Sequence, residues 1–298
     1  MDILQISHLK KRFGEREVLR DLSFNVPEHT VFGFVGQNGA GKTTTMKIIL
    51  GLLEQDGGDV TVCGEKVRYG QTSTNRFIGY LPDVPEFYTC FTPFEYLCFC
   101  GSIAGLDKAK SESRATELLE TVGLSAEKRR IKGFSRGMKQ RLGIAQALLT
   151  EPKLLICDEP TSALDPVGRK EILDILVAAK ERTTVVFSTH ILSDVERICD
   201  EIAFLHKGEV VLHGTIDEVK QHHRSTGFEL ELENVTDSAK LRDVFPDAKP
   251  LSASHFLFES GEKPDDVMRF LLDSHVPFLR LEKREPSLEA LFMEVVGK

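Results

Sequence analysis

A glycine-rich segment between an apolar run and a helical pattern constrains this chain more than any other feature. Residues 36–43, with the sequence GQNGAGKT, fit the spacing G-x-x-x-x-G-K-T and directly follow the strand-like run Val31–Val35. Glycines at these positions let backbone N–H groups converge on phosphate oxygens, and the positive end of the next helix faces the anion. The segment therefore predicts a loop that binds a nucleoside triphosphate.

Individual residues of this loop have expected roles. Lys42 would reach the β- and γ-phosphates, and Thr43 would give its hydroxyl to Mg²⁺. A chance glycine-rich turn is the alternative, and the flanking strand and helix argue against it. The expected nucleotide contacts are Gly36, Asn38, Gly39, Ala40, Gly41, Lys42, Thr43 and Thr44.

Two neighbouring carboxylates stand at the end of a second apolar run. Leu154–Cys157 is followed by Asp158 and Glu159, so both acids come at the end of a buried strand, where chain direction aims them at the phosphates. Asp158 suits the Mg²⁺ shell, and Glu159 suits the general base that polarises the attacking water. Without the loop, the pair could equally be two acids that cap a turn.

The composition limits which classes of partner and which cellular compartment are expected. Lys and Arg number 38 against 46 Asp and Glu, and no basic block is present, so we expect no nucleic-acid partner. The longest apolar runs have strand length, too short to cross a bilayer. The N-terminus lacks the pattern of a secretory signal. We therefore expect a cytoplasmic protein.

Hydrophobic periodicity indicates two domains. Strands alternate with helices to about residue 220, which favours an α/β fold with a mainly parallel sheet, and a helical insertion occupies about 91–150. A polar linker at 221–227 then leads to a small α+β accessory domain, so the expected domains are 1–220 and 221–298. Strands are expected near 4–6, 22–26, 31–35, 77–81, 154–157, 184–187, 202–211, 228–232 and 255–258. Helices are expected near 43–53, 93–104, 110–122, 137–149, 167–180, 237–245, 264–273 and 287–296.

Cysteines and histidines offer two weak metal hypotheses. Cys98 and Cys100 are two residues apart, so on a helix they point to different faces, and buried free thiols explain them better. His222 and His223 fit a solvated linker better than a metal site, because no other ligand-type residues are nearby.

A hydroxyl and a glycine at a helix start form a further element. Ser135, Arg136 and Gly137 precede a helical pattern, so Ser135 could be an ordinary cap or its helix start could bind an anion.

The order of these elements resembles the nucleotide-binding subunit of ABC transporters. The phosphate loop, Ser135 with Gly137, the two acids, the segment 162–165 and His190 follow one another in that family's order over about residues 1–220. The form Phe-Ser-Arg-Gly-Met at 134–138 and the tail at 285–292 resemble the branch that exports drugs, sodium or lipids. The resemblance implies a P-loop ATPase with a mixed-sheet core, an antiparallel β subdomain and an α-helical subdomain.

The resemblance also implies that two chains, as a homodimer or heterodimer, enclose two ATPs head to tail. Each site would then take Ser135 and Gly137 from the second chain, Asp165 would couple the sites, and His190 would contact the γ-phosphate. Phe13 aligns with the aromatic residue that stacks on adenine, although ordinary packing explains a phenylalanine equally well.

Asp83 departs from the family pattern, which has Gln or sometimes Glu there. Its side chain is shorter and charged, so its contact with Mg²⁺ would run through water. Arg136 also replaces a small glycine. The segment 86–93 and the helical insertion are expected to dock a membrane partner, or else to form local core.

The function that follows is an ATPase subunit that powers a separately encoded exporter, held at the cytoplasmic face of the membrane by its permease partner. A kinase or GTPase would share only the phosphate loop, and no guanine-reading Asn-Lys-x-Asp is present. The stronger alternative is a soluble ABC ATPase that acts on ribosomes or DNA. Such proteins carry two ATPase units or a long coiled coil in one chain, and neither is found here.

Overall fold

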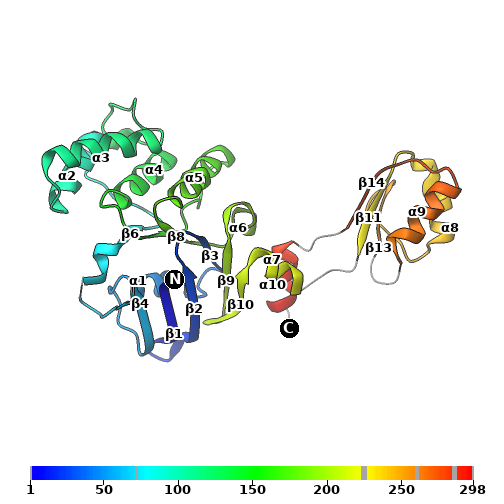
Figure 1. Cartoon of the computed structure of the whole chain (residues 1–298), viewed down its shortest axis with the longest axis horizontal. Coiled ribbons are helices and arrows are strands. Elements are labelled where there is room, and N and C mark those ends of the chain that lie inside the picture. The colour runs from blue at the N-terminus through cyan, green and yellow to red at the C-terminus, as the bar shows by residue number, and fades with distance from the viewer. Residues whose placement is uncertain (1, 72, 223–226, 259–261, 284–286, 297–298) are drawn as a thin grey trace. The chain divides into compact units, whose positions relative to one another are not determined.

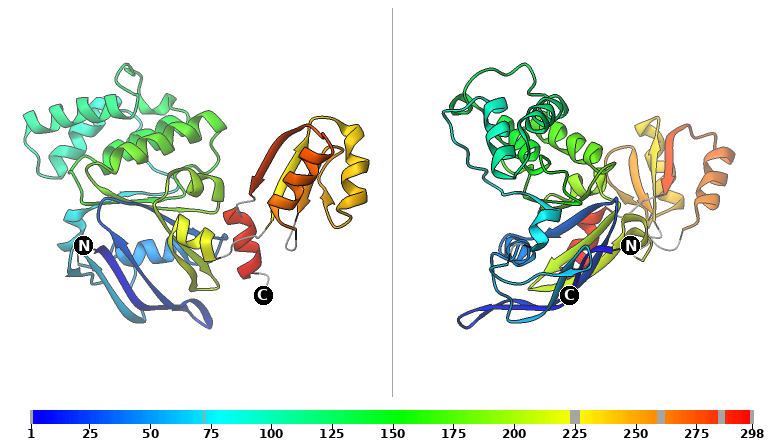
Figure 2. Two further views of the ribbon diagram at one scale, coloured as in Figure 1. Left: turned by 45° about the vertical axis from the view of Figure 1, so that its right-hand side comes forward. Right: turned by 60° about the vertical axis from the view of Figure 1, so that its left-hand side comes forward.

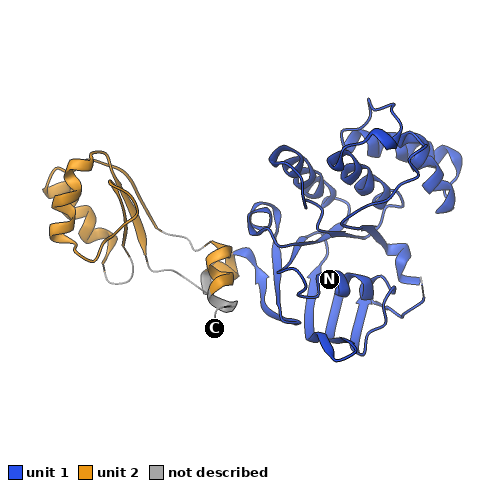
Figure 3. Cartoon of the chain, turned by 180° about the vertical axis from the view of Figure 1, so that it is seen from behind, with its two compact units in different colours: residues 1–216 blue, residues 217–298 orange. Residues whose placement is uncertain are grey.

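The computed structural model describes residues 2–71, 73–222, 227–258, 262–283 and 287–296. The chain divides into two compact units, residues 1–216 and residues 217–298, which Figure 3 shows in different colours. Each unit has its own sheet and its own hydrophobic core.

Five parallel strands form the centre of the first unit. They lie in the order β9 (Glu201–His206), β3 (Val31–Gly36), β8 (Thr184–Thr189), β7 (Leu154–Asp158) and β6 (Ile78–Leu81). Every residue of β3, β7 and β8 is buried, as expected for a parallel sheet covered on both faces. Because the strands are parallel, the loops that follow β3, β7 and β8 leave the same edge of the sheet.

An antiparallel part extends this sheet. It contains β1 (Asp2–Phe13), β2 (Arg16–Pro27), β4 (Gly57–Val62) and β5 (Glu65–Lys66), and it reaches the parallel strands through β10 (Glu209–Thr215). Phe24 of β2 stacks on Phe32 and Phe34 of β3, with ring centroids 5.4 and 5.2 Å apart. A single hydrophobic core therefore lies beneath both parts.

The helices of the first unit fall into two groups (Figures 1 and 2). Helix α1 (Lys42–Ile49) packs against β3 and β7 of the parallel part and against β4 of the antiparallel part, and α6 (Leu192–Ile198) lies beside β8 and β3. Helices α2 (Pro93–Ile103), α3 (Lys108–Thr121) and α4 (Arg136–Ala147) form a separate helical subdomain next to α5 (Pro166–Ala179). Thr92, Asp107, Ser135 and Asp165 each cap one of these four helices by accepting a backbone N–H. Their starts are therefore encoded locally.

The second unit is built around a four-stranded antiparallel sheet in the order β12 (Lys249–Pro250), β13 (His255–Phe258), β11 (Phe228–Leu232) and β14 (Phe278–Lys283). With α8 (Ser238–Val244) and α9 (Pro264–Asp273), the chain follows the β-α-β-β-α-β succession of ferredoxin-like folds. Phe228 and Phe258 stack at 4.6 Å in its core. The remaining helices are α7 (Ile216–His222) and α10 (Leu288–Val296).

The predicted fold class is confirmed, a mixed sheet with an antiparallel part and a helical part, followed by a small α+β unit. The helix expected over 43–53 is too long, because it ends at Ile49 and Gly51 turns the chain at φ 67°. The predicted linker begins two residues too early, because Gln221 and His222 belong to α7. The rest of the expected linker up to residue 226, with His223, lies outside the described residues.

Elements with weak patterns were not predicted. Strand β4 begins with two glycines, and β14 has no alternation of buried and exposed residues. Within the part of the chain that the structure describes, no helix has both the length and the hydropathy needed to cross a membrane.

Candidate active site

A cleft of about 500 Å³ opens at the carboxyl ends of β3 and β7. The phosphate loop, the turn after β7 and the segment after β8 form its walls, as the parallel sheet requires. Most of its lining residues are those that the sequence singled out. The lining comprises Arg16, Val18, Asn38, Gly39, Gly41, Lys42, Thr43, Thr44, Asp83, Glu159, Ser162 and His190.

The phosphate loop has a backbone path that excludes larger residues. A Cβ atom on Gly36 would lie 2.7 Å from the carbonyl oxygen of Leu205, and one on Gly41 would lie 2.7 Å from a Leu19 methyl group. Gly41 also has φ 117°, a region that L side chains rarely adopt. No side chain caps α1 at Gly41, so the first N–H groups of this helix remain available to an anion.

A chain of hydrogen bonds joins the phosphate loop to the ends of β7 and β8. Thr43 Oγ1 donates to Asp158 Oδ2 at 2.8 Å, and Ser188 Oγ donates to Asp158 Oδ1 at 2.6 Å. The backbone N–H of Glu159 donates to Ser188 Oγ at 3.0 Å. Asp158 is buried, and each of its oxygens accepts a hydrogen bond from a hydroxyl group. Thr43 and Asp158 thus present paired oxygens, which suit a hard divalent cation.

Glu159 lies between two cationic or protonatable groups. Lys42 Nζ is 3.1 Å from Glu159 Oε1 and donates to the Gly36 carbonyl oxygen at 2.6 Å. His190 Nδ1 lies 2.9 Å from Glu159 Oε2. The side chains of Lys42 and Glu159 are only 6% and 14% exposed, so water screens this ion pair weakly. Glu159 also holds φ 47°, a strained backbone for a residue with a Cβ, which is typical of functional turns.

Asp83 reaches the same cleft from the end of β6 but is held by the helical subdomain. Its Oδ1 lies 3.2 Å from Arg136 Nη2, and its carbonyl oxygen accepts from Gln140 Nε2 at 2.7 Å. Arg136 and Gln140 both belong to α4. Asp83 and Arg136, two positions that depart from the family pattern, therefore contact each other.

Some expected residues lie away from the cleft. Ser135 Oγ accepts from the Met138 N–H at 3.2 Å as the cap of α4, and Gly137 is the second residue of that helix. Asp165 caps α5 by accepting from the Gly168 N–H at 2.9 Å. Phe13 ends β1 with 49% of its surface exposed and does not line the cleft. Within one chain, these residues do not meet the phosphate loop.

The structure adds residues that no motif indicated. Ser188 reaches Asp158 because the two are partners in the β7–β8 register, a pairing that periodicity does not reveal. Arg16 and Val18 approach the loop because β2 runs past it. Only Ser188 had a signal in the sequence, because it directly follows the strand expected at 184–187.

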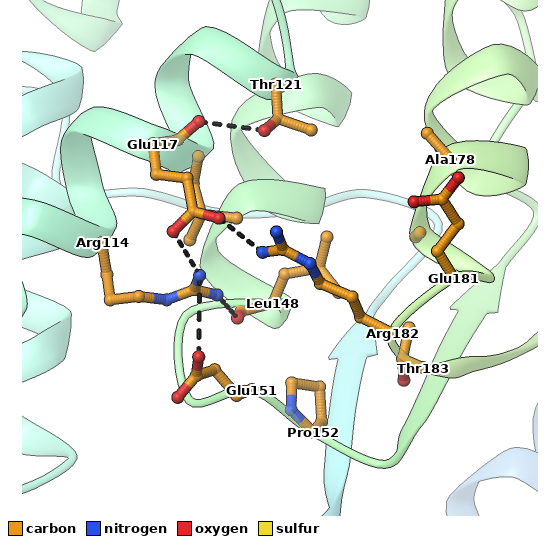
Figure 4. A pocket seen from close by; sticks show the side chains of 12 residues that line it. Arg114, Glu117, Thr121, Leu148, Glu151, Pro152, Ala178, Glu181, Arg182 and Thr183 are labelled. Carbon is orange, nitrogen blue, oxygen red and sulfur yellow. Dashed lines mark hydrogen bonds and ion pairs between the residues drawn. The ribbon is translucent and has the colours of Figure 1, made fainter.

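A second cavity, of about 390 Å³, lies on α3, α4 and the turn after α5 and is shown in Figure 4. Glu117 accepts from both Arg114 and Arg182 at 2.6 Å, and Arg114 also donates to the Leu148 carbonyl oxygen at 2.9 Å. The hydrogen bond from Arg182 lowers the pKa of Glu117. Glu117 thus joins α3 to Arg182 in the turn before β8, whereas the buried Nε of Arg114 has no hydrogen-bond partner among the described residues.

Comparisons with known proteins agree with this geometry. Residues 19–162 match the protein family described as ABC transporter, and residues 214–296 match the ATP-binding protein DrrA1-3-like, C-terminal domain. The uncharacterized ABC transporter ATP-binding protein YxlF of Bacillus subtilis (strain 168) is 39% identical and is covered over 99% of each chain. The bacitracin transport ATP-binding protein BcrA of Bacillus licheniformis is 34% identical, over 99% of this chain and 97% of that protein.

A solved structure described as the ATP-binding subunit of an ABC transporter is similar in fold, with a TM-score of 0.67 and 34% identity. It covers 74% of this chain and 93% of that one. The full-length agreement with the relatives shows the family. The match of residues 214–296 to the DrrA1-3-like C-terminal domain confirms the predicted branch. The chain therefore belongs to the ABC transporter family, as an ATP-binding subunit that hydrolyses ATP.

Proposed function

We propose that the chain hydrolyses magnesium-bound ATP in this cleft as one half of a dimer, and that the energy drives a separately encoded membrane exporter. The observation that carries the proposal is the position of Glu159. It stands at the end of β7, between Lys42 and His190, and its neighbour Asp158 is bonded to Thr43 of the phosphate loop. Glu159 as the base, Lys42 as the cation for phosphate, and the oxygens of Thr43 and Asp158 as metal ligands thus lie close together.

Thr43 and Asp158 are the residues that would hold Mg²⁺. Their oxygens are 2.8 Å apart, and neighbouring ligands of an octahedral Mg²⁺ at about 2.1 Å lie about 3 Å apart. Bound there, the ion would neutralise charge on the β- and γ-phosphate oxygens. Asp83 lines the same cleft, but its carboxylate is engaged by Arg136, which supports an indirect contact through water.

Glu159 is the proposed general base and His190 the proposed contact to the γ-phosphate. Without nucleotide, Lys42 is paired with Glu159, whereas triphosphate oxygens would attract the same ammonium group. Release of Lys42 to the phosphates leaves Glu159 free to accept a hydrogen bond from the attacking water. His190 keeps the carboxylate oriented through its Nδ1 contact.

The positions of the remaining expected contacts support the proposed dimer. Ser135 and Gly137 stand at the start of α4, apart from the cleft of their own chain, and each chain has one copy of each motif. We propose that they complete the cleft of a second chain and that Asp165 and Phe13 act as the resemblance implies. In this proposal residues 1–220 are the ATPase domain, and residues 221–298 are an accessory domain.

An apolar patch on the helical subdomain supports docking of a permease. It consists of exposed side chains on α2 and the segment before it, namely Val84, Tyr88, Phe94, Phe99 and Ile103. The Tyr88 and Phe99 rings meet edge to face at 5.7 Å. Exposed apolar side chains gathered along one segment favour an interaction site. A membrane permease as occupant would place the protein at the cytoplasmic face, and the named role of BcrA in bacitracin transport favours this over ribosomes or DNA.

Glu159→Gln should bind ATP but hydrolyse it at less than about a hundredth of the wild-type rate, because the amide cannot act as a base. Loss of the charge that pairs with Lys42 should also tighten ATP binding. Turnover measurements and size-exclusion chromatography with saturating ATP test this, and the variant should accumulate as an ATP-bound dimer. A monomeric variant with full turnover would contradict the proposal.

Asp83→Gln should keep or raise ATPase activity. Glutamine can still accept a hydrogen bond from Arg136 and restores the longer side chain that most of the family has at this position. Steady-state turnover at saturating ATP is the measurement. Activity below about a tenth of wild type would show that the Asp83 carboxylate has a catalytic role of its own.

Tyr88→Ala should lower membrane association, because Tyr88 is 63% exposed within the apolar patch. The share of the chain that sediments with membranes of the producing cell should fall about tenfold, as for a central aromatic contact. Tyr69→Ala is a matched control, since Tyr69 is 56% exposed outside the patch. Equal losses in both variants, or recovery of the wild type with ribosomes and no membrane protein, would overturn the docking proposal.

A further inference from the structure

Arg16 lies beside the phosphate loop. It begins β2, lines the catalytic cleft, and one of its terminal nitrogens would lie 3.8 Å from a Cβ built on Gly39. Within the residues that the structure describes, its guanidinium makes no ion pair and no hydrogen bond. The neighbouring Arg12 and Arg20 differ, because each lies 4.0 Å from Glu17.

The charges that line the cleft show what Arg16 could bind. Lys42 is paired with Glu159, and Asp83 is paired with Arg136. Among the described residues, therefore, no carboxylate neutralises the positive charge of Arg16 in the lining of the cleft. An exposed arginine that lies next to a phosphate loop suits a phosphate oxygen, for which its planar fork of donors is well matched.

The register of the first two strands indicates which part of a nucleotide Arg16 would contact. Arg16 pairs directly with Phe13 across β1 and β2, so the two side chains share one face of the hairpin. Phe13 is the proposed partner of the adenine. Glu159 and His190, the proposed γ-phosphate end, come instead from the turns after β7 and β8. Arg16 therefore belongs to the end of the triphosphate that is nearest the base.

We infer that Arg16 is an additional nucleotide-binding residue, whose guanidinium holds the α-phosphate end of ATP over the Gly39 backbone. The inference rests on the proposed nucleotide cleft and adds to it a contact that is independent of the γ-phosphate. It predicts that ATP and ADP depend on Arg16 equally. Lys42, which is placed to reach the γ-phosphate, would not show this equality.

Equilibrium titration of magnesium-bound ATP and ADP against wild type, Arg16→Gln and Arg12→Gln tests the inference. Arg16→Gln should bind both nucleotides about tenfold more weakly, the loss expected for one charge-assisted hydrogen bond. Arg12→Gln, an exposed arginine of the same hairpin that does not line the cleft, should stay within about twofold of wild type. Arg16→Lys keeps the charge and should lose no more than about threefold.

Two results would overturn the inference. Arg16→Gln could bind both nucleotides as wild type does, or its loss could be confined to ATP, which would place Arg16 elsewhere. Thermal unfolding without nucleotide should give the same midpoint for wild type and Arg16→Gln, so that a folding defect is recognised. If the folded wild type bound neither nucleotide, the proposed function would fail first, and the two failures are thereby distinguished.

Discussion

The hydrogen bond between Thr43 and Asp158 is the contact on which the rest of the site depends. It joins the helix after the phosphate loop to the end of β7 across the parallel sheet, and Ser188 fixes the other oxygen of the same carboxylate. Because Asp158 is buried, its charge is tolerated only while these hydroxyls are in place. Glu159, the proposed base, directly follows this buried carboxylate and holds a strained backbone at φ 47°.

The ion pairs of the cleft without nucleotide would change when a nucleotide binds. Lys42 and Glu159 neutralise each other in a poorly screened pair, and Asp83 and Arg136 do the same between the cleft and the helical subdomain. A nucleotide that competes for Lys42 would alter the first pair directly. The second pair links α4, which carries Ser135, to the wall of the cleft, and thereby connects the two halves of the proposed composite site.

Local sequence signals predicted the fold and the core of the candidate site well. The phosphate loop, the two acids after β7 and the capped helices depend on residues that are close in sequence, so the pattern alone places them. Ser188 and Arg16 depend on strand register, and the contact between Asp83 and Arg136 spans more than fifty residues. The weakly patterned β14 was missed for a different reason, since exposed strands leave no alternation to detect.

Complementation between two inactive variants distinguishes a composite site from a site held within one chain. Lys42→Ala removes the phosphate-binding cation, and Ser135→Arg blocks the start of α4. If each site draws on two chains, an equal mixture contains heterodimers with one intact site, and activity should return to as much as about a quarter of wild type. If each chain carried a complete site, the mixture would show no more activity than the two variants measured separately. That result would contradict a site shared between two chains.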